Sequence, residues 1–250
     1  MTTAAAREVD RLSALGLDAI LIINVRRFTE RRRHVEAQLA RFGLHGEFVH
    51  EWDAEDITPE ADRRHFAGSA LNAGQKSCAL KHLAALRRVV TKGWQRCLVL
   101  EDDVVLAPDF ADGVRAALAE TRDSPRPFVI YLGAGGNFYT PASRRQPGRR
   151  IYEAQKGRFA DSYVIGAEEA RLRLARIESA PIEKPIDNVF EAVDRAAGIR
   201  FLWLEDPVVE QGSKLGLFRT SLEPAPPNWL QGLRYRLERL RRKFLYQLWR

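Results

Sequence analysis

Short apolar runs alternate along this chain with longer stretches in which apolar residues recur every three or four positions. The run Ala19-Ile20-Leu21-Ile22-Ile23 is typical of a strand buried on both faces of a sheet. The same pattern predicts strands over residues 19–23, 47–52, 97–100, 128–133, 162–165 and 201–204. It predicts helices over residues 4–15, 29–42, 74–92, 108–121, 167–178 and 185–197. This alternation favours an α/β fold with a mostly parallel sheet, in which ligands gather at the carboxyl ends of the strands.

Residues 137–160 lack such a pattern, since their five arginines and their prolines show little periodicity. We predict a mobile substrate loop in this segment. The glycine-rich stretch 133–136 just before it is interpreted as a flexible turn. It is not a phosphate-binding motif, because neither a GxGxxG spacing nor a following helix accompanies it.

The basic charge of the chain is concentrated at its carboxyl end. The net charge is +7, and residues 228–250 hold seven Arg or Lys and one Glu, which is +6 and leaves +1 for the rest. Because this tail carries a leucine stripe rather than groove-reading or base-stacking side chains, we expect no nucleic-acid partner. With 250 residues and 45% hydrophobic residues, the chain can bury a substantial core.

Prolines at 224, 226 and 227 mark a rigid linker, so we divide the chain into a domain over 1–222 and a tail over 223–250. Six apolar tail residues fall on one helical stripe: Leu230, Leu233, Leu237, Leu240, Phe244 and Leu248. A leucine stripe with a basic opposite face predicts a helix lying in the plane of an anionic membrane surface. The alternative is a helix packed on the domain, or on a second copy of the chain in a homodimer.

The sequence predicts a cytoplasmic protein at the inner face of the cytoplasmic membrane. Cys78 and Cys97 fall in a predicted helix and strand and are interpreted as reduced core residues. Charged residues between positions 7 and 11 interrupt any signal-peptide apolar region, and no segment approaches the ~20 apolar residues of a membrane span.

Three consecutive carboxylates, Glu101-Asp102-Asp103, follow directly on the apolar strand 97–100. Their mutual repulsion favours either a loop of solvated acids or a site for a hard divalent cation such as Mn²⁺ or Mg²⁺. Alternation along an extended chain would place Glu101 and Asp103 on one face and Asp102 on the other. One face could then hold the metal while the other holds a sugar hydroxyl.

Several ordered segments of residues 18–215 resemble glycosyltransferase family 25, which includes lipopolysaccharide glycosyltransferases and relatives of the collagen galactosyltransferases. The acidic motif Leu98-Val99-Leu100-Glu101-Asp102-Asp103-Val104 carries the resemblance most strongly. The other matching segments are Ile23-Asn24-Val25-Arg26-Arg27 with Glu30-Arg31-Arg32, Gly74-Gln75 with Cys78-Ala79-Leu80 and His82, Tyr131-Leu132-Gly133, Ser162-Tyr163-Val164-Ile165, Pro185-Ile186-Asp187 and Pro207-Val208-Val209-Glu210-Gln211.

The resemblance implies a GT-A fold, a nucleotide-sugar donor, a divalent metal and inversion at the anomeric carbon. UDP-galactose is the expected donor, with UDP-glucose next, and a lipopolysaccharide or other surface glycan is the expected acceptor. The expected metal ligands are Asp103 and Glu101. The expected donor-binding residues are Asn24, Arg27, Arg32, Gln75, His82, Glu101 and Asp102. For the arginines after residue 29 the alternative is a solvated basic face, and for His82 it is a buried structural histidine.

Inversion in a single displacement needs a carboxylate base to deprotonate the acceptor hydroxyl. Asp187 is our candidate base because its Pro-Ile-Asp setting matches the family. A first-turn or N-cap aspartate would explain the same residue, and Asp161 is the competing candidate.

The chain departs from the family pattern at several positions. Gln75-Lys76-Ser77 stands where the family has Glu-Ile-Gly, Lys81 replaces the serine before His82, and Arg26 replaces the aspartate of the opening motif. The new cations could contact donor phosphates, change the donor, or indicate lost activity. A catalytically silent relative that acts as a binding or scaffolding module is therefore the alternative function.

Overall fold

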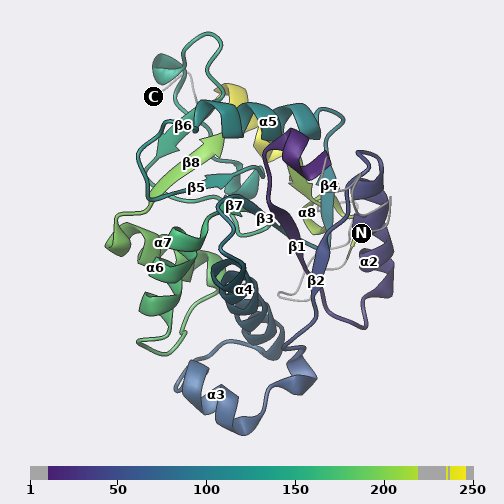
Figure 1. The fold of residues 1–250 in the computed structure, drawn as a ribbon, viewed down its shortest axis with the longest axis vertical. Coiled ribbons are helices and arrows are strands. Elements are labelled where there is room, and N and C mark those ends of the chain that lie inside the picture. Colours follow the sequence, from purple (N-terminus) through teal and green to yellow (C-terminus); the bar gives the residue numbers. More distant parts are fainter. Residues whose placement is uncertain (1–10, 219–234, 236, 246–250) are drawn as a thin grey trace.

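The computed structural model describes residues 11–218, 235 and 237–245, which build a layered α/β arrangement (Figure 1). The strands are β1 (Ala19–Ile23), β2 (Glu47–Val49), β3 (Cys97–Glu101), β4 (Val104–Leu106), β5 (Phe128–Tyr131), β6 (Ile151–Ala154), β7 (Ser162–Ile165), β8 (Arg200–Leu204) and β9 (Val209–Gln211). The helices are α2 (Thr29–Ala40), α3 (Pro59–Phe66), α4 (Ala73–Lys92), α5 (Phe110–Glu120), α6 (Ala167–Ile177), α7 (Ile186–Ala197) and α8 (Gly212–Leu215). Residues 11–15 are also helical and end at Gly16, whose φ of +81° fits the predicted helix stop.

Seven of the described strands form one sheet in the order β2-β1-β3-β7-β5-β8-β6. The neighbours β2, β1 and β3 are parallel to one another, as are β5 and β8, whereas β7 is antiparallel to β3 and β5, and β6 is antiparallel to β8. Five strands therefore run in one direction and two in the other, and the predicted mostly parallel sheet is confirmed. The reversal of β7 was not predicted, because an apolar run buried on both faces reads the same in either direction.

The two faces of this sheet are covered by different helices. Along β1, Leu21 joins the apolar cluster formed with α4, α6 and α7, while Ile22 joins the cluster formed with α2 and α5. The period of two along the strand thus distributes its apolar residues between two cores. This double burial explains why the predicted strands are continuous apolar runs.

A second sheet of two strands, β4 and β9, lies beside the acidic segment. It pairs Val104 with Gln211, so the chain after β9 passes over the turn that carries Asp103. The N–H of Gly212 donates to the carbonyl oxygen of Asp103 at 2.7 Å, and a Cβ at position 212 would lie 2.5 Å from that oxygen. Only glycine permits this close approach, which fixes α8 against the acidic turn.

Two predicted elements need correction, and one helix was missed. The predicted loop 137–160 contains β6, which pairs with β8 at the edge of the sheet. The predicted strand 47–52 ends at Val49, and Trp52 has a φ of +69° that an extended strand does not allow. The helix α3 was not predicted. No helix among the described residues is long and apolar enough to cross a membrane.

The described part of the tail is helical over 237–240 and continues as one π-helical turn over Arg241–Leu245. Its basic side chains contact the domain: Arg239 pairs with Glu210, and Lys243 donates to Asp206 at 2.9 Å. The side chains of Leu237 and Leu240 are 57% and 55% exposed. The helix therefore packs on the domain through its polar side, and the rest of the predicted leucine stripe lies outside the described residues.

Candidate functional site

The parallel pairing of β1 and β3 brings Asn24 and the acidic segment to the same edge of the sheet, since Ile23 is level with Glu101. Asn24 Nδ2 donates to Asp102 Oδ2 at 2.8 Å, and Arg31 Nη1 donates to Asp102 Oδ1 at 3.2 Å. Burial raises the pKa of Asp102 to about 6, and Asp103 adds to the rise, while Arg31 and Asn24 oppose it. Asp102 is thus a buried carboxyl group held in place by two donors.

Asp103 turns away from Asp102 and is held by the start of α8. Its Oδ2 accepts the N–H of Ser213 at 3.1 Å, and its Oδ1 is buried with no hydrogen-bond partner among the described residues. Burial and the charge of Glu101 raise the pKa of Asp103 above its ordinary value. An unpaired buried carboxylate oxygen beside a second carboxylate fits a hard cation such as Mn²⁺ or Mg²⁺.

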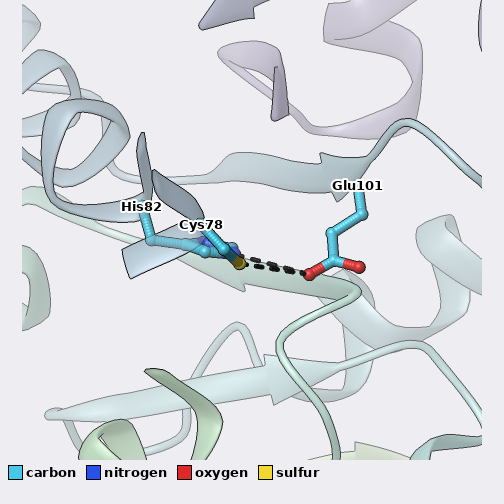
Figure 2. A group of neighbouring side chains, drawn as sticks. All are labelled: Cys78, His82 and Glu101. Carbon is cyan, nitrogen blue, oxygen red and sulfur yellow. Dashed lines mark hydrogen bonds and ion pairs between the residues drawn. The ribbon is translucent and has the colours of Figure 1, made fainter. Parts of the chain in front are cut away.

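Glu101, the last residue of β3, joins the acidic segment to α4. Its Oε2 accepts from Gln211 Nε2 at 3.3 Å. Its Oε1 lies 3.7 Å from His82 Nε2 and 3.9 Å from Cys78 Sγ, and all three side chains converge in Figure 2. His82 is fully buried, and its Nδ1 lies 3.1 Å from the hydroxyl of Tyr163.

The two candidate bases differ in access. Asp161 is 2% exposed, accepts the hydroxyl of Ser162 at 2.8 Å, and lies behind Gly133, where a Cβ would come within 2.4 Å of its Oδ1. Asp187 is half-buried in the first turn of α7, with Pro185 as the N-cap residue. Burial, together with the charge of Glu101, raises the pKa values of both carboxyl groups. Asp187 is therefore the more accessible of the two.

A cavity of about 170 Å³ opens beside Glu101 and Asp102. Among its lining residues are Arg27 and Arg31, from the segment after β1, and Cys78 from α4. In the sequence Arg31 belongs to the matching segment Glu30-Arg31-Arg32, but Arg32 rather than Arg31 was chosen as the donor-binding residue. Because Arg31 lies one residue before Arg32 on α2, its side chain points in another direction and reaches Asp102 after β3.

Two predicted donor-binding residues have other roles in this structure. Arg32 pairs with Glu36 at 3.1 Å on the surface of α2 and lies over the ring of Phe48. Gln75 completes a capping box with Asn72, in which each side chain accepts the backbone N–H of the other residue. Their places on the helices explain both roles. Arg32 lies on the exposed side of α2, and Gln75 is the third residue of α4, from which a side chain can cap the start of a helix.

The departures from the family pattern form structural ion pairs. Lys81 is 1% exposed and lies 2.7 Å from Asp53 Oδ1, and Arg26 Nε donates to Asp53 Oδ2 at 2.9 Å. The two unusual cations therefore share one fully buried carboxylate. Lys76 instead pairs with Asp62 at 2.6 Å. Each of the three altered cations thus has a carboxylate partner within the protein, and Lys81 also lines the cavity beside Glu101 and Asp102.

The sequence drew attention to the segment 207–211 but assigned no role to it. In the structure Gln211 holds Glu101, and the following N–H of Ser213 holds Asp103. Cys78 also belongs to the site but was interpreted as an ordinary core residue. Its helical spacing of four from His82 was the available signal.

The fold and this acidic edge define the class as an α/β protein with a mostly parallel sheet and a cluster of carboxylates at its strand ends. Residues 17–134 match the family model of glycosyltransferase family 25, described as LPS biosynthesis protein, which confirms the predicted family. The chain is 28% identical over 191 residues to a glycosyltransferase 25 family member of Drosophila melanogaster, covering 70% of this chain and 30% of that protein.

Some relatives carry names that indicate lost activity. The human inactive glycosyltransferase 25 family member 3 is 27% identical over 139 residues, which cover 51% of this chain and 23% of that protein. A probable inactive member from Bos taurus is 26% identical over 51% of this chain and 24% of that protein. This chain thus spans about a third or less of the length of these three relatives.

Two solved structures are similar at low identity. Mannose-1-phosphate geranyltransferase from Thermus thermophilus has a TM-score of 0.39 and 13% identity, covering 90% of this chain and 70% of that chain. The inositol-1-phosphate CTP transferase from T. maritima has a TM-score of 0.40 and 8% identity, covering 93% of this chain and 83% of that chain.

Proposed function

We propose that this chain is a metal-dependent inverting glycosyltransferase with a GT-A fold. It moves a hexose, first of all galactose, from a UDP-sugar to a lipopolysaccharide or other surface glycan. The observation that carries this proposal is a cavity lined by two carboxylates, Glu101 and Asp102, and by two guanidinium groups, Arg27 and Arg31. The buried carboxylate of Asp103 follows them directly in the chain. Carboxylates for a cation and guanidinium groups for phosphates are the two requirements of a nucleotide-sugar site.

Asp103 and Glu101 are the residues that would hold Mn²⁺ or Mg²⁺. When bound, the cation would neutralise the charge that develops on the diphosphate as the glycosidic bond breaks. Asp103 is oriented for this by the N–H of Ser213, and Glu101 by Gln211. Both orienting groups come from the end of β9 and the start of α8.

In this proposal the donor binds at the mouth of the 170 Å³ cavity, with its phosphates toward Arg27 and Arg31 and a sugar or ribose hydroxyl toward Asp102. Asn24 keeps Asp102 in position by donating to one of its oxygens. His82 is too deeply buried to reach the donor directly, so we assign it a supporting role through Glu101.

Asp187 is the proposed base. It is half-buried, faces the charge of Glu101, and has a pKa that burial raises above its ordinary value. A raised pKa makes a carboxylate a better proton acceptor for a sugar hydroxyl. Asp161 is less suitable because it is buried behind Gly133 and already accepts a hydrogen bond from Ser162.

The acceptor occupies an open cavity of about 800 Å³ at the edge formed by β6 and β8. Trp203 and Phe138 supply apolar surface there, and the cavity has more cations than acids. The cations that line it are Arg144, Lys156, Arg195 and Arg242. Aromatic surface and positive charge suit an anionic glycan, which is the chemistry of a lipopolysaccharide core.

We further propose that the tail brings the enzyme to the inner face of the cytoplasmic membrane. The exposed side chains of Leu237 and Leu240 carry this proposal, since they offer apolar surface beside the acceptor cavity that Arg242 lines. Dimerisation through the same two leucines is the competing outcome.

The test is UDP release from UDP-galactose and UDP-glucose with and without Mn²⁺, together with calorimetric binding of UDP. Wild type is expected to need Mn²⁺ for both, and Asp103→Asn is expected to lower UDP release by about 100-fold or more. Asp112→Asn is the matched control, because Asp112 is a 71% exposed aspartate on α5. Equal activity of Asp103→Asn and wild type would refute the assigned site.

The second candidate function is a catalytically silent nucleotide-sugar-binding or scaffolding module, and the observation that favours it is the naming of two matched relatives as inactive. Mn²⁺-dependent UDP binding without UDP release from any donor would support a binding module. Absence of both binding and release would support a scaffold.

A further inference from the structure

The side chains of Cys78, His82 and Glu101 form a cluster that the proposed transferase chemistry does not fully use. Cys78 and His82 lie one turn apart on α4 and point toward the end of β3 (Figure 2). One sulfur, one nitrogen and one oxygen atom of the three side chains lie within 4.8 Å of one another. His82 Nε2 is buried and has no hydrogen-bond partner among the described residues.

Thiolate, imidazole and carboxylate are together the ligand set of zinc, whereas the hard cations Mn²⁺ and Mg²⁺ prefer oxygen alone. Usual zinc bond lengths and tetrahedral angles require an N···O separation of about 3.4 Å and an S···O separation of about 3.6 Å. The observed separations are 3.7 Å from His82 Nε2 and 3.9 Å from Cys78 Sγ to Glu101 Oε1. Each needs to shorten by only about 0.3 Å to meet those values.

Neighbouring side chains orient two of the three potential ligands, His82 and Glu101. When His82 Nδ1 carries the proton and donates to the Tyr163 hydroxyl, Nε2 presents its lone pair to Glu101 and Cys78. Gln211 holds the other oxygen of Glu101. Cys78 lines the 170 Å³ cavity, so a cation can reach the cluster from that side.

We propose that Cys78, His82 and Glu101 form a binding site for a borderline-soft divalent cation of the zinc type, with its fourth ligand position open toward the cavity. Binding forms a bond from the metal to each of Sγ, Nε2 and Oε1, and the thiol proton leaves to solvent. This site is distinct from the one at Asp103, but the two share Glu101.

Sharing Glu101 makes the two sites antagonistic, and this consequence rests on the proposed function. A cation held by Cys78 and His82 draws Glu101 toward α4 and away from Asp103. Zinc would then inhibit the Mn²⁺-dependent transferase, and Mn²⁺ in excess would relieve the inhibition. The cluster would thus act as a sensor of zinc-type cations built into the donor site.

The binding claim is tested by titrating the full chain with Co²⁺, which substitutes for zinc and reports a bound thiolate by a charge-transfer band in the near ultraviolet. We expect one equivalent of Co²⁺ to produce the band and Zn²⁺ to displace it. Cys78→Ser should remove the band. Cys97→Ser is the matched control and should keep it, because Cys97 Sγ lies in the core of β3 against the carbonyl of Leu98.

A second measurement needs no variant and so does not depend on how Cys78→Ser folds. Zn²⁺ should protect Cys78 in the native wild-type chain from alkylation by iodoacetamide, as measured by mass spectrometry of its peptide. We expect about tenfold slower alkylation with zinc present. Absence of the cobalt band, its survival in folded Cys78→Ser, or equal alkylation with and without zinc would overturn the site.

Inhibition is tested separately on Mn²⁺-dependent UDP release. Zn²⁺ should inhibit wild type, and Cys78→Ser should need about tenfold or more zinc for the same fractional inhibition. If wild type released no UDP under any condition, the proposed function would fail, while the cobalt band would still decide whether the cation site exists. Inhibition of equal strength in both proteins would refute the antagonism alone.

Discussion

Replacing Lys81 by methionine would leave the buried carboxylate of Asp53 with one cation instead of two. Lys81 is 1% exposed and Asp53 is fully buried, and the lysine also donates to the carbonyl oxygens of His50 and Glu51 at 3.1 and 2.9 Å. Methionine keeps the apolar stem of the lysine but removes all three interactions. The substitution therefore removes the ammonium group with its ion pair and its two hydrogen bonds, while the packing of the stem is kept.

Removing one partner of a buried ion pair costs about 3–5 kcal/mol. Because Arg26 still donates to Asp53 at 2.9 Å, we expect the lower end, about 3 kcal/mol of unfolding free energy. For a chain of this size that loss lowers the melting temperature by about 6–12 °C. Lys81→Met with Asp53→Asn should lose less than Lys81→Met alone, because no unpaired charge is then buried.

The assay is urea unfolding of the full chain followed by circular dichroism. Arg32→Met is the matched control, since Arg32 belongs to an exposed pair with Glu36 and should cost no more than about 1 kcal/mol. If Lys81→Met and Arg32→Met unfolded at the same urea concentration, the structural role assigned to the unusual lysine would be wrong.

The Lys81–Asp53 pair also predicts how the difference in unfolding free energy between wild type and Lys81→Met depends on pH. Burial alone would raise the pKa of Asp53, but the hydrogen bond and charge of Lys81, with Arg26, bring it below the ordinary value of 3.8. A carboxyl group whose pKa is lowered on folding contributes stability above its unfolded pKa, and this contribution is lost as the pH falls through the folded value. The gap between wild type and Lys81→Met should accordingly be constant near neutral pH and shrink below about pH 4. A gap that grew on acidification would contradict this assignment.

The remaining predictions concern the donor site, the base and the tail. Arg31→Met should raise KM for the UDP-sugar about tenfold or more, whereas Arg32→Met should leave it unchanged; equal effects would disprove the placement of the two arginines. Asp187→Asn should lower kcat by about 100-fold or more while UDP binding persists, and full activity would exclude it as the base. Leu237→Glu with Leu240→Glu in the full chain should abolish flotation on anionic vesicles; unchanged flotation would refute membrane binding, and loss of a dimer would indicate self-association.

Much of the chain was predictable because its apolar patterns are strong. The strands β1, β3 and β8 lie within one residue of their predicted bounds, and α4 differs by one residue at its start. The edge strand β6 was missed since an edge strand with one covered face gives a weaker apolar signal. The three-residue strand β9 was not predicted as a strand, although the sequence singled out its segment 207–211 as a motif.

The candidate site, too, was predictable from the sequence only in part. That Glu101, Asp102 and Asp103 follow a buried strand is written in the sequence, and the parallel pairing of β1 with β3 then places Asn24 beside them. Sequence reasoning chose Arg32 rather than Arg31, because the orientation of a helix about its own axis depends on what it packs against. It also could not see that Arg26 and Lys81 meet at one carboxylate.

The sequence by itself determined the class of fold, the family and the position of the acidic motif, since these depend on local apolar periodicity and on ordered short motifs. Only the tertiary structure decided which side chains share the site. Contacts of Cys78 and Gln211 with Glu101 join segments that are 23 and 110 residues away along the chain. Such long-range contacts are set by strand order and direction, which a one-dimensional pattern does not encode.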